Sequence, residues 1–340
     1  FDREKEEISV AEIIDVTLKD VVLYRICKML PYGWVMVSGT DKVIPVLAYG
    51  LNKINISRKP ENFSAWMKHW ENELYTISDK NIIPSEEIRN EWARLSDPDF
   101  CRQRGLRAVE PMLISIWNQD YPYNALCPED PDGPHGRTYA GCVATAMGQL
   151  MFFYRWPETG TGSYTYQHPD YGTISADFEN ATYEWEEMCN DAGASNMAIA
   201  KLLYHLGVSV DMDYGPNGSG MWNHKAAYSL RTYFKFSPET EYVFRDSTSM
   251  SWDSLVLAHL DRQMPCYYAG WAGVGSTSGH AFVVDGYQTS DYFHFNWGWG
   301  GSWDGYFYLD NLTPGGSNFN YAQELIINAY PDTLNYTYPS

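Results

Sequence analysis

The chain has 340 residues and a net charge of −19, with 24 Lys and Arg against 43 Asp and Glu. Its 44% of hydrophobic and 20% of charged residues are typical of a folded protein and exclude a disordered tail. No apolar run approaches the roughly 20 residues that a membrane-spanning helix needs. An acidic surface repels phosphate backbones, so no nucleic-acid partner is expected.

The charge is unevenly distributed, which points to two domains. Residues 1–107 hold 16 basic and 17 acidic residues, whereas residues 108–340 hold 8 and 26. The change coincides with a polar, Arg-rich stretch from Leu95 to Val109 that lacks a sustained hydrophobic period. Exposed stretches of this kind connect domains. We therefore expect one domain over 1–107 and a second over 108–340.

The first domain is predicted to be a small α+β unit. Two β-rich runs within residues 33–50 flank turn residues 38–41, which indicates a hairpin, and alternation over residues 21–27 indicates another strand. From residue 61 to residue 75, apolar side chains recur at intervals of three and four, as in a helix. No cluster of catalytic type occurs here, which favours a covering module.

Cys142 is the first candidate for chemistry in the second domain. From Val143 onward the apolar residues follow one helical face, and the pattern stops before Pro157. Cys142 is thus predicted in the first turn, where unpaired N–H groups and the helix dipole favour a thiolate and can bind an oxyanion. A buried structural cysteine fits this segment equally well. The six cysteines show no Cys-x-x-Cys spacing, so zinc and dithiol sites are not indicated.

The C-terminal third alternates with a period of two. Strands are predicted at residues 266–269, 281–285, 292–297, 305–309 and 324–328, spaced as in an antiparallel, barrel-like sheet. His280 follows Gly279 at the start of one strand, where a backbone can approach a substrate closely. A structural histidine is the alternative, and His294, also on a strand, is the main rival. Asn296 could hold an imidazole in one tautomer, and Trp297 could shield that hydrogen bond from water.

A cysteine on an early helix and a histidine on a late sheet is the arrangement of papain-like enzymes. Four segments resemble those of streptopain-like cysteine proteases, in the same order and at similar separations: Gly141-Cys142-Val143-Ala144-Thr145-Ala146, residues 208–216, Gly279-His280-Ala281-Phe282-Val283-Val284-Asp285-Gly286 and Asn296-Trp297-Gly298-Trp299-Gly300-Gly301. Residues 33–39 resemble the hairpin of this family's inhibitory propeptide. The resemblance implies an α+β fold, with a small α+β prodomain before a papain-like catalytic domain made of a helical subdomain and an antiparallel barrel-like sheet.

The resemblance also implies residue roles. Cys142 would be the nucleophile and His280 its base, with Asn296 and Trp297 orienting and covering the imidazole. The backbone N–H groups of Cys142 and Val143 would bind the oxyanion. Papain-type enzymes carry a Gln six residues before the Cys, where this chain has a glycine, so a side-chain donor is not assigned. The residues expected to line the substrate cleft are Met212, Tyr214, Ser219, Gly279 and Trp299. Met and Tyr suit an apolar P2 side chain.

By the same resemblance the chain would be the zymogen of a secreted or cell-envelope bacterial endopeptidase that acts on proteins or peptides. Its prodomain would inhibit in cis by displacing the catalytic histidine. Removal of the prodomain is expected between Arg107 and Ala108, because Leu106 supplies an apolar P2 residue. The chain begins at Phe1 rather than at a Met, so we expect an earlier segment to have been removed. No metal or cofactor is implied.

Two alternatives compete with a peptidase. Papain-like folds also catalyse amidase, transglutaminase and other acyl-transfer reactions, which a Cys–His pair alone does not distinguish. The 13 Trp and 27 Tyr could instead form an aromatic platform that binds glycans or proteins without catalysis. A binding module predicts that Cys142→Ala leaves function intact and that thiol reagents label nothing selectively.

Overall fold

The computed structural model describes residues 8–52, 54, 61–80, 82–96, 108–271, 279–288, 292–308 and 322–333. Before residue 108 the elements are β1 (Ser9–Leu18), β2 (Val21–Leu30), β3 (Trp34–Ser38), β4 (Val46–Gly50), α1 (Glu61–Asp79) and α2 (Glu86–Leu95). After it come β5 (Ala108–Val109), α3 (Cys142–Tyr154), β6 (Ser163–His168), β7 (Gly172–Asp177), α4 (Met197–Ser209), α5 (His224–Tyr233), β8 (Glu241–Phe244), α6 (Trp252–Leu260), β9 (Cys266–Trp271), β10 (Gly279–Gln288), β11 (Tyr292–Asn296), β12 (Gly305–Tyr308) and β13 (Glu324–Ile327).

One sheet runs through most of the molecule. Its strands are hydrogen-bonded in the order β1-β2-β3-β4-β12-β11-β10-β9-β13-β8, with β5 added to β10. The hairpin over residues 33–50, the strand over 21–27, the helix from residue 61 and the C-terminal strands all occur where the sequence predicted them. The α+β architecture is confirmed. Within the described ranges, the two end strands of the sheet, β1 and β8, are not paired with each other, so the sheet is open.

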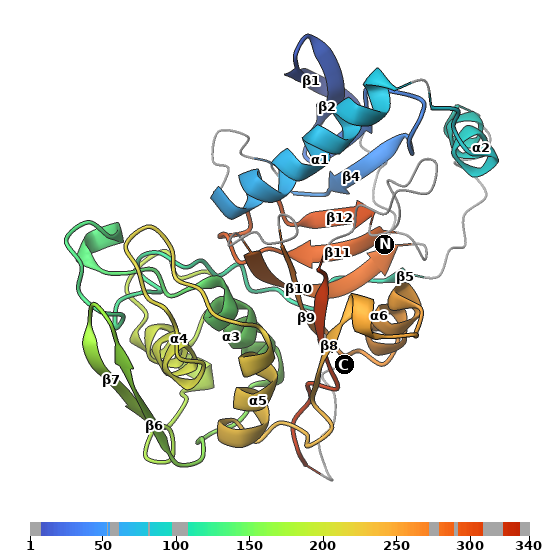
Figure 1. The fold of residues 1–340 in the computed structure, drawn as a ribbon. Helices are drawn as coiled ribbons and strands as arrows, with labels where there is room; N and C mark the ends of the chain where they lie inside the picture. Colours follow the sequence, from blue (N-terminus) through green and yellow to red (C-terminus); the bar gives the residue numbers. More distant parts are fainter. Residues whose placement is uncertain are drawn as a thin grey trace.

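The sheet passes from the N-terminal strands β1–β4 to the C-terminal strands β8–β13 through one antiparallel pair (Figure 1). In this pair β4 is hydrogen-bonded to β12, with Tyr49 opposite Tyr306, and the two rings stack 5.0 Å apart. Trp34 on β3 is buried and contacts Trp303 edge-on and Phe307, with ring centroids at 5.9 and 6.0 Å. The two parts therefore share one hydrophobic core across the junction.

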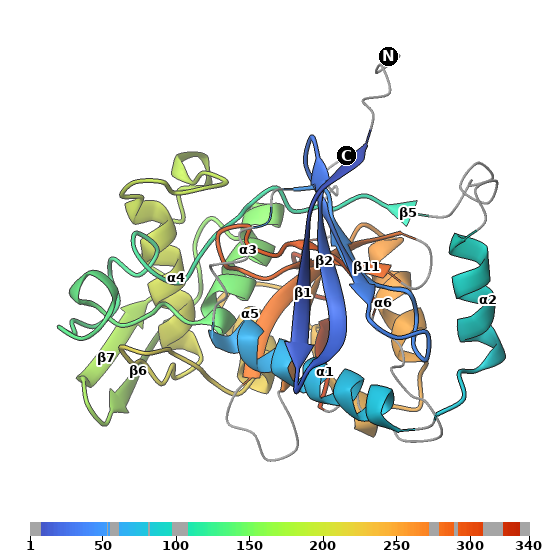
Figure 2. The same ribbon diagram turned by 90° about the horizontal axis from the view of Figure 1, so that it is seen from above.

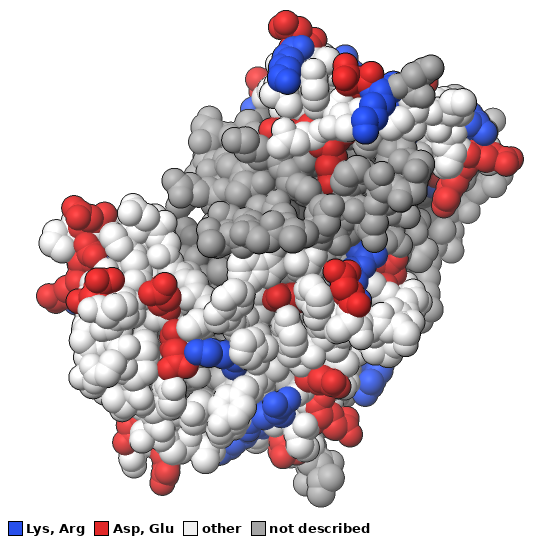
Figure 3. Space-filling view, viewed as in Figure 1, with Lys and Arg blue, Asp and Glu red and all other residues white. Residues whose placement is uncertain are grey.

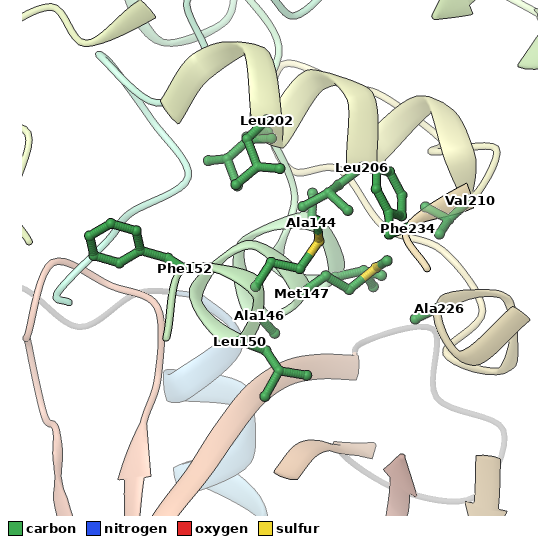
Figure 4. Close-up of a cluster of buried hydrophobic side chains, with 14 of the residues drawn as sticks. Ala144, Ala146, Met147, Leu150, Phe152, Leu202, Leu206, Val210, Ala226 and Phe234 are labelled. Carbon is green, nitrogen blue, oxygen red and sulfur yellow. The ribbon is translucent and has the colours of Figure 1, made fainter. Parts of the chain in front are cut away.

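The helical subdomain is formed by α3, α4, α5 and the β6–β7 hairpin, and it lies beside the C-terminal strands of the sheet (Figures 1 and 2). The sequence predicted one apolar face for α3, but nearly all of its residues are buried. The reason is its central place, since one side packs against α4 and the other against β9 and β10. Figure 4 shows this core, where Ala144 and Met147 of α3 lie toward Leu206 of α4 and Leu150 points to the opposite side of the helix.

The connector predicted over residues 95–109 lies mostly outside the described residues. Helix α2 ends at Leu95, and Ala108–Val109 forms β5 against β10. On the face shown in Figure 3, acidic side chains predominate over the helical subdomain, in keeping with the charge of residues 108–340. Among the described residues, no helix has the length and apolar character needed to cross a membrane.

Candidate active site

Gly141 determines how α3 begins. Its φ of 92° is a backbone conformation that residues with a side chain rarely adopt. A Cβ at this position would lie 2.8 Å from the Met212 sulfur and 3.1 Å from the Ser219 carbonyl oxygen. Only glycine allows the chain to turn here, and the turn places Cys142 at the first position of the helix.

The Cys142 thiol is only 6% exposed and faces three backbone N–H groups, those of Ala281, Val143 and Cys142 itself. Burial raises the pKa of this thiol, and the three N–H groups oppose that change without reversing it. The helix N-terminus alone led us to expect a lowered pKa, and desolvation outweighs it in this form of the chain. Cys142 is therefore a thiol here at neutral pH.

His280, on β10, is fixed in one tautomer. Its Nε2 lies 2.8 Å from the carbonyl oxygen of Trp297, and because a carbonyl only accepts, Nε2 carries the proton. Nδ1 is then the nitrogen with the free lone pair, and this buried atom has no hydrogen-bond partner among the described residues. The ring stacks on Trp299 with centroids 4.3 Å apart. Cys142 and His280 thus lie on adjoining elements, without a hydrogen bond between them.

Burial lowers the pKa of His280 to about 3, against the weaker opposing effect of the Trp297 carbonyl. The unfolded chain, with a histidine pKa of about 6.5, binds this proton at pH values where the folded chain does not. Stability should therefore fall as the pH drops from 6.5 toward 3, by up to about 1.4 kcal/mol per pH unit for this group.

We expect His280→Gln to remove that contribution. Urea unfolding at pH 7 and pH 5 measures it, in chains that also carry Cys142→Ala to prevent self-cleavage. The loss of stability between the two pH values should be about 2 kcal/mol smaller in the variant. Burial also lowers the pKa of His205, to about 4, so a dependence of the same sign should remain. Identical pH dependence in both chains would contradict a neutral, buried His280.

Asn296 does not bond to His280 directly. Its Oδ1 accepts hydrogen bonds from Gln149 Nε2 at 2.9 Å and from the Gly298 N–H at 3.2 Å, and its Nδ2 donates to the Ser115 carbonyl. The Trp297–Gly298 peptide is therefore held by Asn296 at its N–H and by His280 at its carbonyl. The sequence placed Asn296 next to the imidazole, whereas the structure places it one peptide away.

Gln149 is a buried residue of this network that the sequence analysis missed. It lies two helical turns after Cys142 on α3, and its Oε1 accepts from the Ser115 hydroxyl and the Trp117 N–H. A heptad separation puts positions 142 and 149 on the same side of a helix. That spacing was visible in the sequence, but a glutamine inside a helix carries no signal of its own.

His294, the rival of His280, is engaged elsewhere. Its Nδ1 lies 2.6 Å from Oδ1 of the buried Asp285, and the nearby carboxylates of Asp285, Asp304 and Glu110 raise its pKa against the effect of burial. The second oxygen of Asp285 accepts from the Leu113 N–H. This pair joins β10 and β11 to the segment that follows β5, so a structural role accounts for it.

The expected cleft residues fall into two groups. Met212, Ser219 and Gly279 lie beside Cys142 and His280, the first two against Gly141 and the third directly before His280. Trp299 covers the face of the His280 ring. Tyr214 lies in the core of the helical subdomain, and its hydroxyl approaches the α4 residues Gly207 and Tyr204 rather than Cys142.

Comparison with known sequences identifies a family and several relatives. The family model of the Peptidase C10 family matches residues 117–307. The chain is 33% identical over 319 residues to the thiol protease/hemagglutinin PrtT of Porphyromonas gingivalis, covering 88% of this chain and 36% of that protein. It is 29% identical over 330 residues to streptopain of Streptococcus pyogenes, covering 88% and 78%. The chain thus spans only about a third of PrtT.

Two solved structures superpose on the chain. Prointerpain A of Prevotella intermedia superposes with a TM-score of 0.74 at 30% identity, covering 95% of this chain and 99% of that one. Active interpain A of the same species superposes with a TM-score of 0.59 at 37% identity, covering 66% and 95%. With the family model matching more than half of the sequence, this chain belongs to the Peptidase C10 family of cysteine peptidases.

Proposed function

We propose that this chain is the latent precursor of a cysteine endopeptidase in which Cys142 is the nucleophile and His280 its base. The observation that carries the proposal is the arrangement around the Cys142 sulfur. The sulfur lies at the first turn of α3 and faces the N–H of Ala281, the residue that follows His280 in the chain. Nδ1 of His280 is unprotonated and free to accept the thiol proton.

Once the thiolate has formed, it attacks the carbonyl carbon of a peptide bond and produces a tetrahedral oxyanion. The N–H groups of Cys142 and Val143 have no intrahelical partner at the first turn and can donate to that oxygen. The imidazolium then donates its proton to the leaving amine, and an acyl-enzyme remains. Water, deprotonated by Nδ1, hydrolyses the thioester and restores the thiol.

We assign the prodomain to residues 1–107 and the catalytic domain to residues 108–340. The coverage of the two interpain structures supports this division, because the active enzyme aligns with about two thirds of this chain and the proenzyme with nearly all of it. The buried thiol and the missing Cys142–His280 hydrogen bond fit a precursor held in an unreactive state. The prodomain would then act as an inhibitor in cis through its junction at β4 and β12.

The substrates we propose are proteins and peptides with an apolar P2 side chain. Met212 is buried directly against Gly141, next to the nucleophile, where a soft thioether can adapt to aliphatic shapes. We further propose that the protein is secreted by, or attached to the envelope of, a bacterium. The three species of its relatives are bacteria, which supports this proposal.

A self-processing experiment tests the function. The purified chain is incubated with and without a thiol reductant, then analysed on a gel and assayed with casein. We expect reductant-dependent shortening to about 25 kDa, from the mean mass of the residues after 107, together with casein hydrolysis. Cys142→Ala should abolish both. Shortening or hydrolysis that persists in Cys142→Ala would overturn the assignment, and binding without hydrolysis would favour the aromatic platform.

The same sample locates the activation site. Ala108 begins β5, and Arg107 lies just outside the described residues. We expect N-terminal sequencing of the shortened chain to start at Ala108, because the connector before it is polar and Leu106 supplies an apolar P2 residue. A Leu106→Asp variant should mature more slowly at this bond. A mature N-terminus outside residues 100–112 would refute the placement.

A further inference from the structure

The loop between β11 and β12 supplies the Trp297 carbonyl that bonds to His280 and the Trp297 and Trp299 rings that stack with it. It runs from Trp297 to Asp304 and contains several residues with positive φ: Gly298, Gly300, Gly301 and Trp303. A loop of this shape is not held by a regular strand ladder, and it needs another constraint. Besides the Gly298 bond to Asn296 and a bond from the Gly300 N–H to the Trp117 carbonyl, the carboxylate of Asp304 accepts the Trp297 N–H at 2.8 Å and joins the two ends of the loop.

Trp297 is held on both sides of its Cα. Asp304 holds its N–H, and the Nε2–H of His280 donates to its carbonyl at 2.8 Å. The indole N–H also donates to the Trp303 carbonyl, so the side chain cannot swing without breaking a third bond. We propose that Asp304 is a positioning residue for His280, fixing the Trp297 backbone so that its carbonyl holds Nε2–H and leaves Nδ1 as the base. This inference rests on the proposed role of His280.

A carboxylate suits this position better than a neutral acceptor would. Hydrogen bonds to an ionised acceptor are roughly twice as strong as neutral ones, so the loop base is held more firmly. The negative charge also favours the imidazolium that forms when His280 takes the thiol proton. Asp304 is 6% exposed and its carboxylate bonds to the Trp297 N–H, so it acts through Trp297 and not by touching a substrate.

The charge of Asp304 depends on its surroundings. Burial raises its pKa to about 7, the neighbouring carboxylate of Asp285 adds to the rise, and the Trp297 N–H and His294 oppose it. His294 in turn faces Asp285 and Glu110. With a pKa of about 7, Asp304 is about half ionised at neutral pH and becomes fully ionised as the pH rises further. Its electrostatic effect should therefore appear as the pH rises through 7.

Kinetics on the matured enzyme test the proposal. In Asp304→Ala the acceptor is lost, and kcat for a peptide substrate should fall by about 10²-fold with KM unchanged. In Asp304→Asn the acceptor is kept and only the charge is lost. The ratio of wild-type to variant kcat should then be near one at pH 5 and rise through pH 7. The same exchange at Asp177, whose carboxylate accepts the Asn180 N–H on an exposed hairpin, is the matched control.

A second measurement does not depend on activity. In the precursor, the buried Nε2–H of His280 should give a downfield, slowly exchanging proton signal by NMR. Asp304→Ala should broaden or remove it, while Asp304→Asn and Asp177→Asn should retain it. A constant kcat ratio at all pH values, or an unchanged signal in Asp304→Ala, would overturn the proposal. Absence of thiol-dependent hydrolysis in the wild type would instead overturn the proposed function, with the NMR result still standing.

Discussion

Replacing Cys142 with Ser should reduce the peptidase activity of the matured chain by a factor on the order of 10⁶, to the background of the assay. The exchange keeps the shape of the side chain but raises the pKa of the nucleophile far beyond the reach of an imidazole base. Because the thiol is buried against Ala281 and Val143, which Ser also fits, the fold should be retained. Steady-state hydrolysis of casein, with circular dichroism of the same samples, measures both.

Alkylation distinguishes the nucleophile from the other cysteines. In the precursor, burial raises the pKa of Cys142, and it raises the pKa values of Cys127 and Cys266 to about 12, so all three should react slowly with iodoacetamide. Among the described cysteines, Cys189 is exposed and Cys27 is partly exposed, so both contribute background labelling, which Cys27→Ser and Cys189→Ser together reduce. After maturation, Cys142 should become the fastest-reacting thiol. Full activity of Cys142→Ser, or of an enzyme alkylated at Cys142, would contradict the proposed mechanism.

Gly305→Val should loosen the prodomain and speed self-activation. A Cβ on Gly305 would lie 2.6 Å from the Tyr49 carbonyl oxygen, 3.0 Å from Cζ2 of Trp34 and 3.2 Å from the Gly50 Cα, all of them in the N-terminal strands. Two of these contacts involve backbone atoms, which cannot move aside by changing rotamer. Overpacking of this kind costs about 1–3 kcal/mol, so docking should weaken about 5- to 150-fold.

The measurement is the rate of shortening in reductant, together with the casein activity present before any cleavage. Trp34→Ala is the matched control, because it weakens the same contact from the other side. Because residue 34 is removed with the prodomain, the mature enzyme obtained from Trp34→Ala is identical to the wild type. Wild-type rates of shortening in both variants would show that the β4–β12 junction does not maintain latency.

The local parts of the site could be predicted from the sequence. Cys142 and His280 are marked by patterns a few residues long, a helix start and a strand start, and the structure places both where those patterns put them. Asp304 and Gln149 were missed for a physical reason. An aspartate before a strand resembles an ordinary turn residue, and its importance arises only from the hydrogen bond that it makes to Trp297.

The pairing that joins the two parts of the chain could not be predicted from the sequence either. Tyr49 and Tyr306 are far apart along the chain, and nothing local indicates that β4 and β12 pair. The acidity of Cys142 is a similar case. The first turn of a helix favours a thiolate, but the burial that reverses this preference depends on how α3 packs against β10. Hydrophobic periodicity and composition predict helices and strands, whereas strand pairing across the chain and the pKa of a buried thiol depend on tertiary contacts.

The segment from Ala108 to Trp117 limits how many residues the mature N-terminus can lose. Beyond β5, Met112 and Leu113 donate to Asp285, and Ser115 and Trp117 reach the Gln149 network. An exopeptidase that removed residues from the mature N-terminus beyond β5 would therefore remove, one after another, the hydrogen bonds that hold Asp285 and Gln149. The enzyme should tolerate the loss of only a few N-terminal residues. Its lifetime among other proteases should depend on how tightly the segment from Ala108 to Trp117 stays bound to the rest of the domain.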